Sequence, residues 1–406
     1  MDYLILNDIP TPWREPVFER VYHKLTGTVQ VVYFKDNEKR RLWTFNQGSH
    51  PKTVLRSLTI TTCGKERFFN PGILPFLLRQ RPRVALIFTS FKDPTGWLAL
   101  LICRVLGTKI ALLEDTWLGR DRGINGLQRL ARRIGYNCFG DAFVGASRQT
   151  LAMFKHYNRR LIPEQLFLSH LVADNDYFKT QLSGKRLERR FDVMFSGRIV
   201  PVKNPEFFAK VCAGVKARIG RCRVLIIGEG QADLKAAMRT IFERHGVEYE
   251  FTGFIKHAAL PDYYAQAKLL LMPTSGDCWG VVINEAMLAG TPVITTEMTA
   301  AAGELVLHEQ NGYVLPLDVD AWTQVIVEML KNEGKWELFS RNAQSKVQEF
   351  TFDNAAAGIM AAFRYLEAPG GTSASMSKSR YGPRTKHEAE LEPKANQFRT
   401  SRCQAR

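Results

Sequence analysis

The sequence lacks the cysteine pattern of a secreted or zinc-binding protein. Its seven cysteines are odd in number and scattered, and none belongs to a C-x-x-C pair: Cys63, Cys103, Cys138, Cys212, Cys222, Cys278 and Cys403. This usage favours a reducing, cytoplasmic compartment and argues against a zinc site. A secretory signal is missing too, because Met1 leads directly into the strand-like segment YLIL.

Long apolar runs and common catalytic signatures are absent as well. The longest apolar stretch, Gly96 to Gly107, is interrupted by Arg104 and is shorter than the ~20 residues of a membrane-spanning helix. No Ser-His-Asp arrangement, nucleophile elbow or P-loop occurs. Seven histidines show no metal-ligand spacing and are interpreted as surface or structural residues: His23, His50, His156, His245, His257, His308 and His387. We therefore expect neither a membrane span nor a metal site.

Negative charge is scarce in the first half of the chain, and the imbalance is local. Residues 1–190 carry 31 Lys+Arg against 16 Asp+Glu, residues 191–368 carry 17 against 21, and residues 369–406 carry 8 against 3. A basic first half attracts nucleic acid, an anionic membrane leaflet or a phosphorylated acceptor, and a solvated basic surface would have the same composition. Charge alone does not choose among these.

One stretch concentrates this charge. Residues Gly119 to Tyr136 contain five arginines and predict an amphipathic helix, in which three of the arginines share one face by their spacing: Arg129, Arg132 and Arg133. Its apolar positions are Leu127, Leu130 and Ile134. The arginine face suits anionic lipid headgroups, and a polar face exposed to water would look the same.

What the chain does contain is a regular alternation of strands and helices. The 406 residues have room for two domains of ~100–200 residues each, and 45% hydrophobic content can fill both cores. Buried-strand patterns at Val84–Phe88 and Lys109–Leu113 flank a helical pattern at Pro94–Leu106, which predicts parallel sheets. The expected organisation is a first domain at 1–182, a linker at 183–191, a second domain at 192–352, a terminal helix at 353–368 that returns to the first domain, and a disordered basic tail at 369–406.

The segment Leu269 to Thr296 places two carboxylates where strand, loop and helix meet. Leu269–Met272 predicts a buried strand, and Val281–Ala289 predicts a helix closed by Gly290. Asp277 therefore lies in the loop at the carboxyl end of a strand, and Glu285 lies about one turn inside the helix. This edge of an open α/β sheet is where ligands bind, and the first amide groups of the helix favour an anion.

This segment resembles the acidic-x7-acidic motif of family 4 retaining glycosyltransferases. The matching residues are Asp277, Trp279, Gly280, Asn284, Glu285, Ala286, Met287, Gly290 and Pro292. The resemblance implies the GT-B architecture, two facing Rossmann-like α/β domains with parallel sheets and an inter-domain cleft. It also implies that Asp277 holds donor-sugar hydroxyls and that Glu285 holds the ribose of a nucleotide sugar. The first acid is more often Glu in the family, so the shorter Asp277 brings its loop closer to the sugar or alters the contact.

The start of the second domain strengthens this resemblance. The predicted strand and loop of this segment, FDVMFSGRIVPVKNP, place Gly197, Arg198 and Lys203 at a sheet edge. In the family it resembles, the matching Arg and Lys bind the donor diphosphate. A departing nucleoside diphosphate gains negative charge, which a guanidinium and an ammonium stabilise without a metal. Six further positions are predicted to approach the donor at turns or at the helix start: Gly228, Gly253, Cys278, Trp279, Gly280 and Val281.

The first domain supplies the acceptor candidates. A proline-rich loop with Arg14 between Pro12 and Pro16 stands where many family members have a Gly-rich loop, so Arg14 faces an acceptor phosphate or pairs with a nearby glutamate. Glu114 and Asp115 follow a predicted strand and can orient an acceptor hydroxyl or act as its base, while Asp115 can also simply cap the next turn. Asp174-Asn175-Asp176 mimics the D-x-D metal motif of another transferase fold, but it falls at the domain exit and is not assigned to metal.

The resemblance implies a retaining, metal-independent transferase that moves a hexose from a nucleotide-diphosphate sugar to a hydroxyl of a glycan or a polyprenyl-linked saccharide. The sugar nucleotide is then a substrate, and no cofactor is expected. The expected setting is bacterial polysaccharide or lipopolysaccharide synthesis in the cytoplasm, in contact with the inner membrane surface and without nucleic acid. The alternatives are a sugar-nucleotide-binding relative with hydrolase or epimerase activity, and a non-catalytic basic binding module.

Overall fold

The structure is a computed structural model, and it describes residues 1–36, 48–62, 65–88, 91, 93–185 and 188–368, with the side chains of 59–68 and 121–123 left out. The tail at 369–406, for which we predict disorder, lies outside the described residues, as do Cys63, Arg186 of the predicted linker and the side chain of Arg122. Residues 1–368 form one compact unit that contains two parallel sheets.

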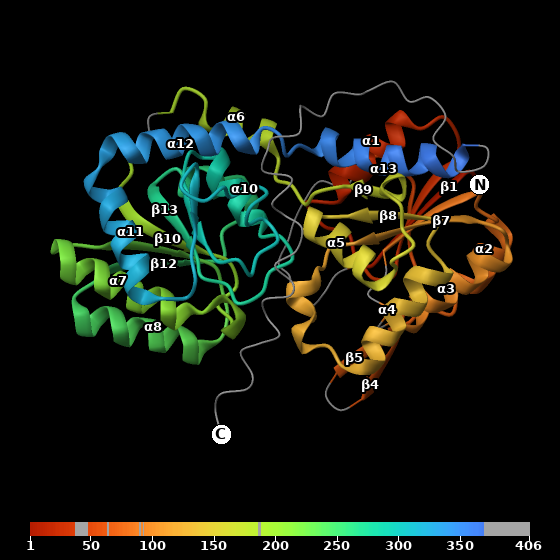
Figure 1. Cartoon of the computed structure of the whole chain (residues 1–406), viewed down its shortest axis with the longest axis horizontal. Helices are drawn as coiled ribbons and strands as arrows, with labels where there is room; N and C mark the ends of the chain where they lie inside the picture. The colour runs from red at the N-terminus through yellow and green to blue at the C-terminus, as the bar shows by residue number, and fades with distance from the viewer. Residues whose placement is uncertain (37–47, 63–64, 89–90, 92, 186–187, 369–406) are drawn as a thin grey trace. The chain divides into compact units, whose positions relative to one another are not determined.

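The first sheet is parallel throughout, with the strand order β3-β2-β1-β6-β7-β8-β9 (Figure 1). Its strands are β1 (Tyr3–Asn7), β2 (Val29–Tyr33), β3 (Lys52–Val54), β6 (Val84–Phe88), β7 (Lys109–Glu114), β8 (Ala142–Gly145) and β9 (Leu166–Leu168). The central strands are buried on both faces, which is why they read as continuous apolar runs in the sequence.

Two layers of helices cover this sheet. Alternate residues of β1 divide between two cores: Tyr3 and Ile5 pack with α1 (Glu15–Lys24) and α13 (Phe352–Glu367), and Leu4 and Leu6 pack with the helices of the opposite face. Those helices are α2 (Ile73–Gln80), α3 (Pro94–Val105), α4 (Gly126–Cys138) and α5 (Arg148–Tyr157). A separate antiparallel hairpin, β4 (Leu58–Thr62) and β5 (Lys65–Phe69), precedes α2, and the sequence analysis did not identify it.

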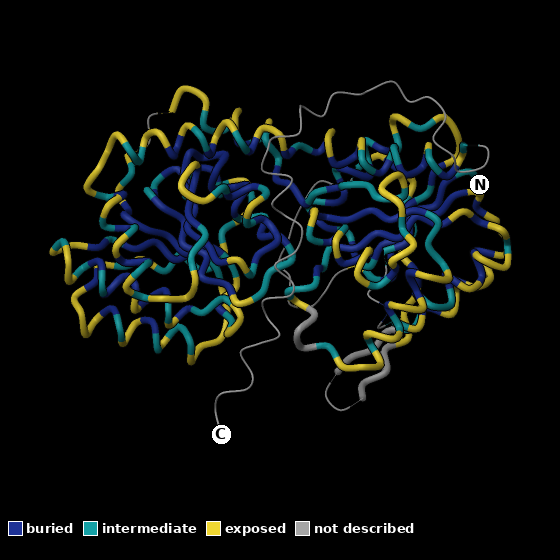
Figure 2. Tube along the Cα trace, viewed as in Figure 1, coloured by how far each residue is buried: buried dark blue, intermediate teal, exposed yellow. Residues whose placement is uncertain are grey.

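The second sheet is also parallel, in the order β12-β11-β10-β13-β14-β15. Its strands are β10 (Phe191–Ser196), β11 (Arg223–Ile227), β12 (Glu248–Gly253), β13 (Ala267–Met272), β14 (Val293–Thr295) and β15 (Gly312–Val314). The surrounding helices are α6 (Asn175–Leu182), α7 (Pro205–Ile219), α8 (Ala232–His245), α9 (Leu260–Tyr264), α10 (Val281–Leu288), α11 (Val319–Lys331) and α12 (Glu333–Val347). Figure 2 shows that the strands of both sheets are buried beneath these helices.

Short 3₁₀ helices occur in four of the described connections: η1 (Leu118–Gly123), η2 (Pro163–Gln165), η3 (Pro201–Lys203) and η4 (His257–Ala259). The two sheets confirm the predicted α/β class with two parallel Rossmann-like folds. The last helix, α13, packs on α1 and on β7 to β9 of the first sheet, and the Tyr3 hydroxyl donates a hydrogen bond of 2.6 Å to Glu367. The chain therefore ends its described part on the domain in which it begins.

The arginine-rich helix differs from its prediction. The predicted helix from Gly119 is in fact η1 followed by α4, which starts only at Gly126. Arg132 does not share a face with Arg129 and Arg133, because it is buried and its guanidinium lies 3.4 Å from the sulfur of Met153. The apolar positions Leu127, Leu130 and Ile134 are exposed, whereas Gly135 and Tyr136 are buried.

Candidate donor and acceptor site

The carboxyl ends of β10 and β13 lie next to each other, since these two strands pair directly in the middle of the second sheet. Asp277 follows β13 in a loop, and Glu285 lies in the second turn of α10, as the sequence pattern predicts. Gly280 starts α10 with a φ of 89°, and a Cβ atom there would come within 2.7 Å of the Met272 methyl group. Glycine is therefore needed where the loop turns into the helix.

Asp277 forms an ion pair with Lys203, which ends the 3₁₀ turn after β10. Both side chains keep 19% of their surface exposed, so a ligand can reach them. The neighbouring loops are fixed by two hydrogen bonds, from the Asn204 side chain to the Pro273 carbonyl (2.7 Å) and from the Asp277 amide to the Met298 carbonyl (2.9 Å). The predicted sugar-binding acid and the predicted diphosphate-binding cation are thus brought together.

Glu285 is almost fully enclosed, with 9% of its surface exposed. The Tyr264 hydroxyl lies 2.7 Å from its carboxylate and also 2.7 Å from the Ser196 hydroxyl. Burial raises the pKa of Glu285 to about 7, although the hydrogen bond from Tyr264 acts in the opposite direction. The carboxyl group is therefore held in a fixed orientation and titrates near neutral pH.

Arg198 is exposed at the same edge, in a turn whose backbone is tied to the next strand. The Ile199 amide donates to the Glu229 carbonyl (2.9 Å), and a Cβ atom on Gly228 would lie 2.0 Å from the Gly197 carbonyl oxygen. Gly228 also has a φ of 129°, so the close approach of the two turns requires glycine there. Arg198 is therefore an exposed residue in a turn with a fixed backbone, five positions before Lys203.

Two of the predicted donor-binding glycines line a common hollow. Gly228 and Gly253 end β11 and β12, and they border a space of about 250 Å³ together with Glu229, Lys235 and Thr252 among others. Lys235 pairs with Glu229 at 2.8 Å within this hollow. The strand ends next to Arg198 are therefore open to a small ligand.

The residues that open α10 offer backbone groups to a ligand rather than side chains. Trp279 is fully buried, and its indole donates to the Asn284 side chain (2.9 Å). Cys278 is partly buried, and this loss of solvent raises the pKa of its thiol to about 11, so the thiol stays uncharged. The amide groups of Gly280 and Val281 belong to the first turn of the helix, where an anion is favoured.

Arg14 and Asp115 of the first domain bind each other. The Arg14 side chain is 2% exposed, forms an ion pair with Asp115 and donates to both the carbonyl and the hydroxyl of Ser169 at 3.0 Å. Arg14 thus joins the strand ends of β1, β7 and β9. Asp115 itself keeps 21% of its side chain exposed, so it is the member of the pair that a ligand can touch.

Glu114 and Asp115 separate into two environments, although they are neighbours in the sequence. Glu114 ends β7 with a buried side chain that accepts a hydrogen bond of 2.9 Å from the Tyr136 hydroxyl. Asp115 lies at the open edge of the sheet. Of the two acids, Asp115 has the position that suits contact with an acceptor.

Contacts between the two sheets' loops add residues that sequence reasoning did not assign. The Trp117 indole donates to the Asp277 carbonyl (2.7 Å), and the Arg120 guanidinium lies 2.7 Å from the sulfur of Cys278. Glu304 contacts the start of α5. Its carboxylate accepts a hydrogen bond from the Arg148 amide (2.9 Å) and lies 2.7 Å from the His170 ring. The segment after Asp115 therefore reaches the loop that carries Asp277, the predicted sugar-binding acid.

Sequence patterns give little signal for these supporting residues. Tyr264 lies 21 positions before Glu285 and Ser196 lies 68 before Tyr264, so neither spacing belongs to a local motif. Glu304 and His170 pair across 134 positions, and this pairing follows only from the fold. Trp117 is separated from the acidic pair Glu114-Asp115 by a single residue. This closeness is the one local sign that Trp117 belongs to the site.

Neither a metal-binding cluster nor a membrane-spanning helix occurs in the part of the chain that the structure describes. It contains no group of three or more His, Cys, Asp or Glu side chains placed to hold a metal ion. No helix in the same part is long and apolar enough to cross a membrane. Cys103, Cys138, Cys212, Cys222 and Cys278 are free thiols.

Comparison with known proteins points to one family. Residues 190–332 match the family described as "Glycosyl transferases group 1". An uncharacterized glycosyltransferase of Methanocaldococcus jannaschii is 28% identical over 168 residues, and a 2-deoxystreptamine N-acetyl-D-glucosaminyltransferase of Niallia circulans is 27% identical over 172 residues. These matches cover 40% and 42% of this chain, and in each case they span 42% of the length of the relative.

Solved structures resemble a larger part of the chain. Alr3699/HepE of Anabaena in complex with UDP covers 90% of this chain and 100% of its own, with a TM-score of 0.69 and 16% identity. Sucrose-phosphate synthase of Thermosynechococcus elongatus covers 90% of this chain and 99% of its own, with a TM-score of 0.67 and 16% identity. At this identity the likeness establishes the fold, and that fold is GT-B, as predicted.

Proposed function

We propose that this chain, whose second domain belongs to the glycosyl transferases group 1 family and whose fold is GT-B, is a retaining glycosyltransferase that uses a nucleotide-diphosphate sugar. The observation that carries the proposal is the Lys203–Asp277 ion pair at the carboxyl ends of two adjacent strands. Arg198 follows the same strand as Lys203, and Glu285 lies in the helix after Asp277. Two cations and two acids in this arrangement match the parts of a sugar nucleotide.

Each part of the donor has a partner of suitable charge. Arg198 and Lys203 bind the diphosphate, since they are the cations next to the first amide groups of α10. Asp277 accepts hydrogen bonds from the sugar hydroxyls, and Glu285 accepts them from the ribose, held in place by Tyr264. A nucleotide sugar entering this site displaces Lys203 from Asp277 and places the ammonium against phosphate.

The proposed reaction breaks the bond between the sugar C1 atom and the diphosphate oxygen while the acceptor oxygen forms a bond to C1 on the same face. The acceptor proton passes to the departing diphosphate oxygen, and the anomeric configuration is retained. Negative charge grows on the leaving group, and the guanidinium of Arg198 and the ammonium of Lys203 stabilise it. This pair of cations is the reason for proposing that the donor needs neither a metal nor a cofactor.

Asp115 receives the acceptor in this proposal. Its carboxylate lies at the open edge of the first sheet and is oriented by the buried Arg14, so it can accept a hydrogen bond from the attacking hydroxyl. Arg14 acts through Asp115 as a positioning residue, because its own side chain is 2% exposed. The contact from Trp117 to the Asp277 loop links the acceptor acid to the donor acid.

For the substrate and setting, we propose a hexose donor and a glycan or polyprenyl-linked saccharide acceptor in bacterial polysaccharide or lipopolysaccharide synthesis. The basic first domain, with 31 Lys+Arg against 16 Asp+Glu up to residue 190, supports contact with an anionic membrane surface on the cytoplasmic side. One of the relatives named above is a 2-deoxystreptamine N-acetyl-D-glucosaminyltransferase, and the sugar in its name is compatible with a hexose-type donor.

The test is product analysis with the intact protein. Nucleotide sugars of glucose, galactose, mannose and N-acetylglucosamine are incubated with short saccharide acceptors in the presence of a chelator, and the new linkage is examined by NMR. The expected product has the anomeric configuration of the donor. An inverted product, or turnover that depends on added metal, would refute the mechanism.

The same experiment separates the alternatives. Free sugar without a coupled product would indicate a hydrolase, and a changed sugar still attached to the nucleotide would indicate an epimerase. If no donor binds while binding to polyanions falls steeply with salt, the chain is a charge-driven binding module.

A further inference from the structure

Helix α4 turns an apolar strip toward solvent. Leu127, Leu130 and Ile134 follow one another at helical spacing and are 74%, 52% and 43% exposed. The opposite side of the helix is buried through Arg132, Gly135 and Tyr136. This arrangement is the reverse of an ordinary surface helix, whose apolar strip faces the core.

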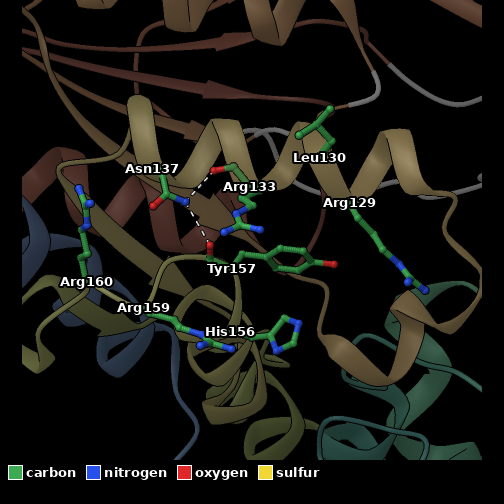
Figure 3. Close-up of a pocket in the computed structure, with 8 residues that line it drawn as sticks. All are labelled: Arg129, Leu130, Arg133, Asn137, His156, Tyr157, Arg159 and Arg160. Carbon is green, nitrogen blue, oxygen red and sulfur yellow. Dashed lines mark hydrogen bonds between the residues drawn. The ribbon is translucent and has the colours of Figure 1, made fainter.

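A basic groove runs beside this strip. It lies between α4 and the end of α5, has a volume of about 740 Å³ and is lined by Arg129, Arg133, Asn137, His156, Arg159 and Arg160 among others. Figure 3 shows the first three side chains coming from α4 and the others from the end of α5 and the turn after it. The Asn137 amide ties the two walls together by donating to the Arg133 carbonyl (2.7 Å) and the Tyr157 carbonyl (3.1 Å).

The groove carries positive charge without a matching acid. Among the described residues, no Asp or Glu lines it, and none of its four arginines forms an ion pair. Guanidinium groups bind phosphate oxygens through paired hydrogen bonds. The apolar strip of α4 lies directly alongside, because Leu130 lines the groove as well.

We propose that α4 and the groove form a docking site for an anionic phospholipid bilayer. The lipid phosphates bind Arg129, Arg133, Arg159 and Arg160, and the side chains of Leu127, Leu130 and Ile134 enter the boundary between headgroups and acyl chains. The site gives the membrane contact of the proposed function a defined surface, but it does not depend on the identity of the sugar donor.

Other occupants fit the two features less well. The phosphates of a nucleic acid would bind the arginines, but its charged backbone has no apolar surface to cover the leucines, which would stay in water. The chain's own segment 369–406 carries 8 Lys+Arg against 3 Asp+Glu, so it has the same sign of charge as the groove. A bilayer of anionic lipid is the partner that satisfies both the basic groove and the apolar strip.

The position of α4 gives the docking site a functional consequence. The helix follows β7 and begins eleven residues after Asp115, so its first turn lies toward the sheet edge that carries the proposed acceptor acid. Docking through Leu127 in that first turn brings this edge near the bilayer. An acceptor anchored in the membrane then reaches Asp115 without leaving the lipid.

The experiment is vesicle flotation with the full-length protein in the absence of any nucleotide. Binding is titrated against vesicles of phosphatidylcholine alone and of phosphatidylcholine mixed with phosphatidylglycerol, at low and high salt. We expect binding to the anionic vesicles only, and we expect it to weaken with salt. Arg129→Gln/Arg133→Gln should weaken it by roughly 25-fold, because each basic residue near such a surface contributes about fivefold.

The apolar strip is tested separately with Leu127→Gln/Leu130→Gln, which should weaken binding by roughly tenfold or more. Both leucines are exposed, so the double variant should fold normally. Matched controls lie on the second domain: Lys210→Gln/Arg221→Gln removes two exposed charges, and Leu317→Gln/Leu338→Gln removes two exposed leucines. The controls should bind the vesicles like the wild type.

Three results would overturn the proposal. They are equal binding to neutral and anionic vesicles, wild-type binding by either α4 variant, and an equal loss in the control variants. Competition with a single-stranded oligonucleotide adds a fourth: if the oligonucleotide binds in an arginine-dependent manner and vesicles do not, the groove is a nucleic-acid site. None of these results bears on the nucleotide site, because no donor is present.

Discussion

The two sheets place a cation and an acid together at the same kind of edge, but they do so differently. In the second domain, Lys203 and Asp277 are both partly exposed, so a ligand can separate them. In the first domain, Arg14 is 2% exposed beneath Asp115 and is further held by Ser169. In the proposed function, the exposed pair serves ligand binding and the buried cation of the other pair serves positioning, so burial distinguishes the two proposed roles.

The largest expected effect follows from removing the exposed cations. Arg198→Ala and Lys203→Ala should each lower kcat by roughly 10²–10³-fold, because each removes positive charge from the place where the leaving diphosphate becomes more negative. The fold should survive, since Arg198 is exposed and Lys203 is bound only to a partly exposed acid. Steady-state kinetics measure kcat, and a thermal melt measures whether the fold survives.

Lys210→Ala, at an exposed position of α7, is the matched control and should retain wild-type turnover. If Arg198→Ala or Lys203→Ala turned over donor at the wild-type rate, the assignment of the diphosphate-binding pair would be wrong.

The buried cation should show the opposite pattern. Arg14→Ala should lower the free energy of unfolding by about 3–5 kcal/mol, because it leaves the Asp115 carboxylate and the Ser169 carbonyl without their donor. Lys203→Ala should change it by at most about 1 kcal/mol, as expected for a solvent-accessible pair. Urea unfolding followed by circular dichroism gives both values.

Asp115→Asn separates positioning from stability in the same pair. It should slow turnover by roughly 10²-fold or more while retaining most of the unfolding free energy, because the amide oxygen can still accept from Arg14. A variant that unfolded like Arg14→Ala but kept wild-type kcat would contradict the acceptor role of Asp115.

The two acids of the donor site should differ in their response to pH. The pKa of Glu285 is raised to about 7 by burial, so only its ionised fraction is ready to accept hydrogen bonds from ribose. The affinity for a nucleoside diphosphate should rise by roughly tenfold between about pH 6 and about pH 8 as that fraction grows. Isothermal titration of wild type and Glu285→Gln checks this, since the variant should lose the Glu285 part of the pH dependence.

The stability of the ligand-free protein should change with pH in the opposite direction to the nucleotide affinity. Because the pKa of Glu285 is higher in the folded state than its ordinary value of 4.5, its contribution to stability is present below about pH 4.5 and is lost as the pH rises through about 7. Stability and nucleotide affinity should therefore move in opposite directions across this range. Parallel changes would show that another group controls the binding.

The smallest effect concerns a buried cluster of the first domain. Burial disfavours the charged form of His50, but hydrogen bonds to Glu15 and Glu19 outweigh burial and raise its pKa above 6.5. His50→Gln should destabilise the fold by about 1 kcal/mol at acidic pH, and the difference should shrink as the pH rises through the raised pKa. The control His245→Gln, at an exposed position, should show no such trend in urea unfolding.

The sequence predicted the placement of Asp277 and Glu285 better than that of Arg14 and Asp115, for a physical reason. Asp277 and Glu285 lie eight positions apart on one loop and one helix, so their relative placement is a local property. Arg14 and Asp115 lie 101 positions apart, and their ion pair exists only because β1 and β7 end at the same edge. Local spacing could not show that Arg14 is buried.

The orientation of α4 was also beyond the sequence pattern. The periodicity of Leu127, Leu130 and Ile134 predicts an apolar strip, but it does not say whether that strip faces the core. In the fold, Tyr136 and Gly135 occupy the core side, where Tyr136 packs against Phe91, Phe143 and Phe154. The packing of Tyr136 against these aromatic rings therefore fixes which face of α4 is buried, and Leu127, Leu130 and Ile134 lie on the exposed face.

The most direct test of the donor site is a thermal-shift measurement with UDP, GDP, ADP and TDP, without added metal, on wild type, Glu285→Ala and Lys210→Ala. A ligand that binds only the folded protein raises its Tm. We predict a rise with one of these nucleotides in wild type and in Lys210→Ala, and its loss in Glu285→Ala. No rise with any nucleotide, or an equal rise in Glu285→Ala, would contradict the proposed donor site.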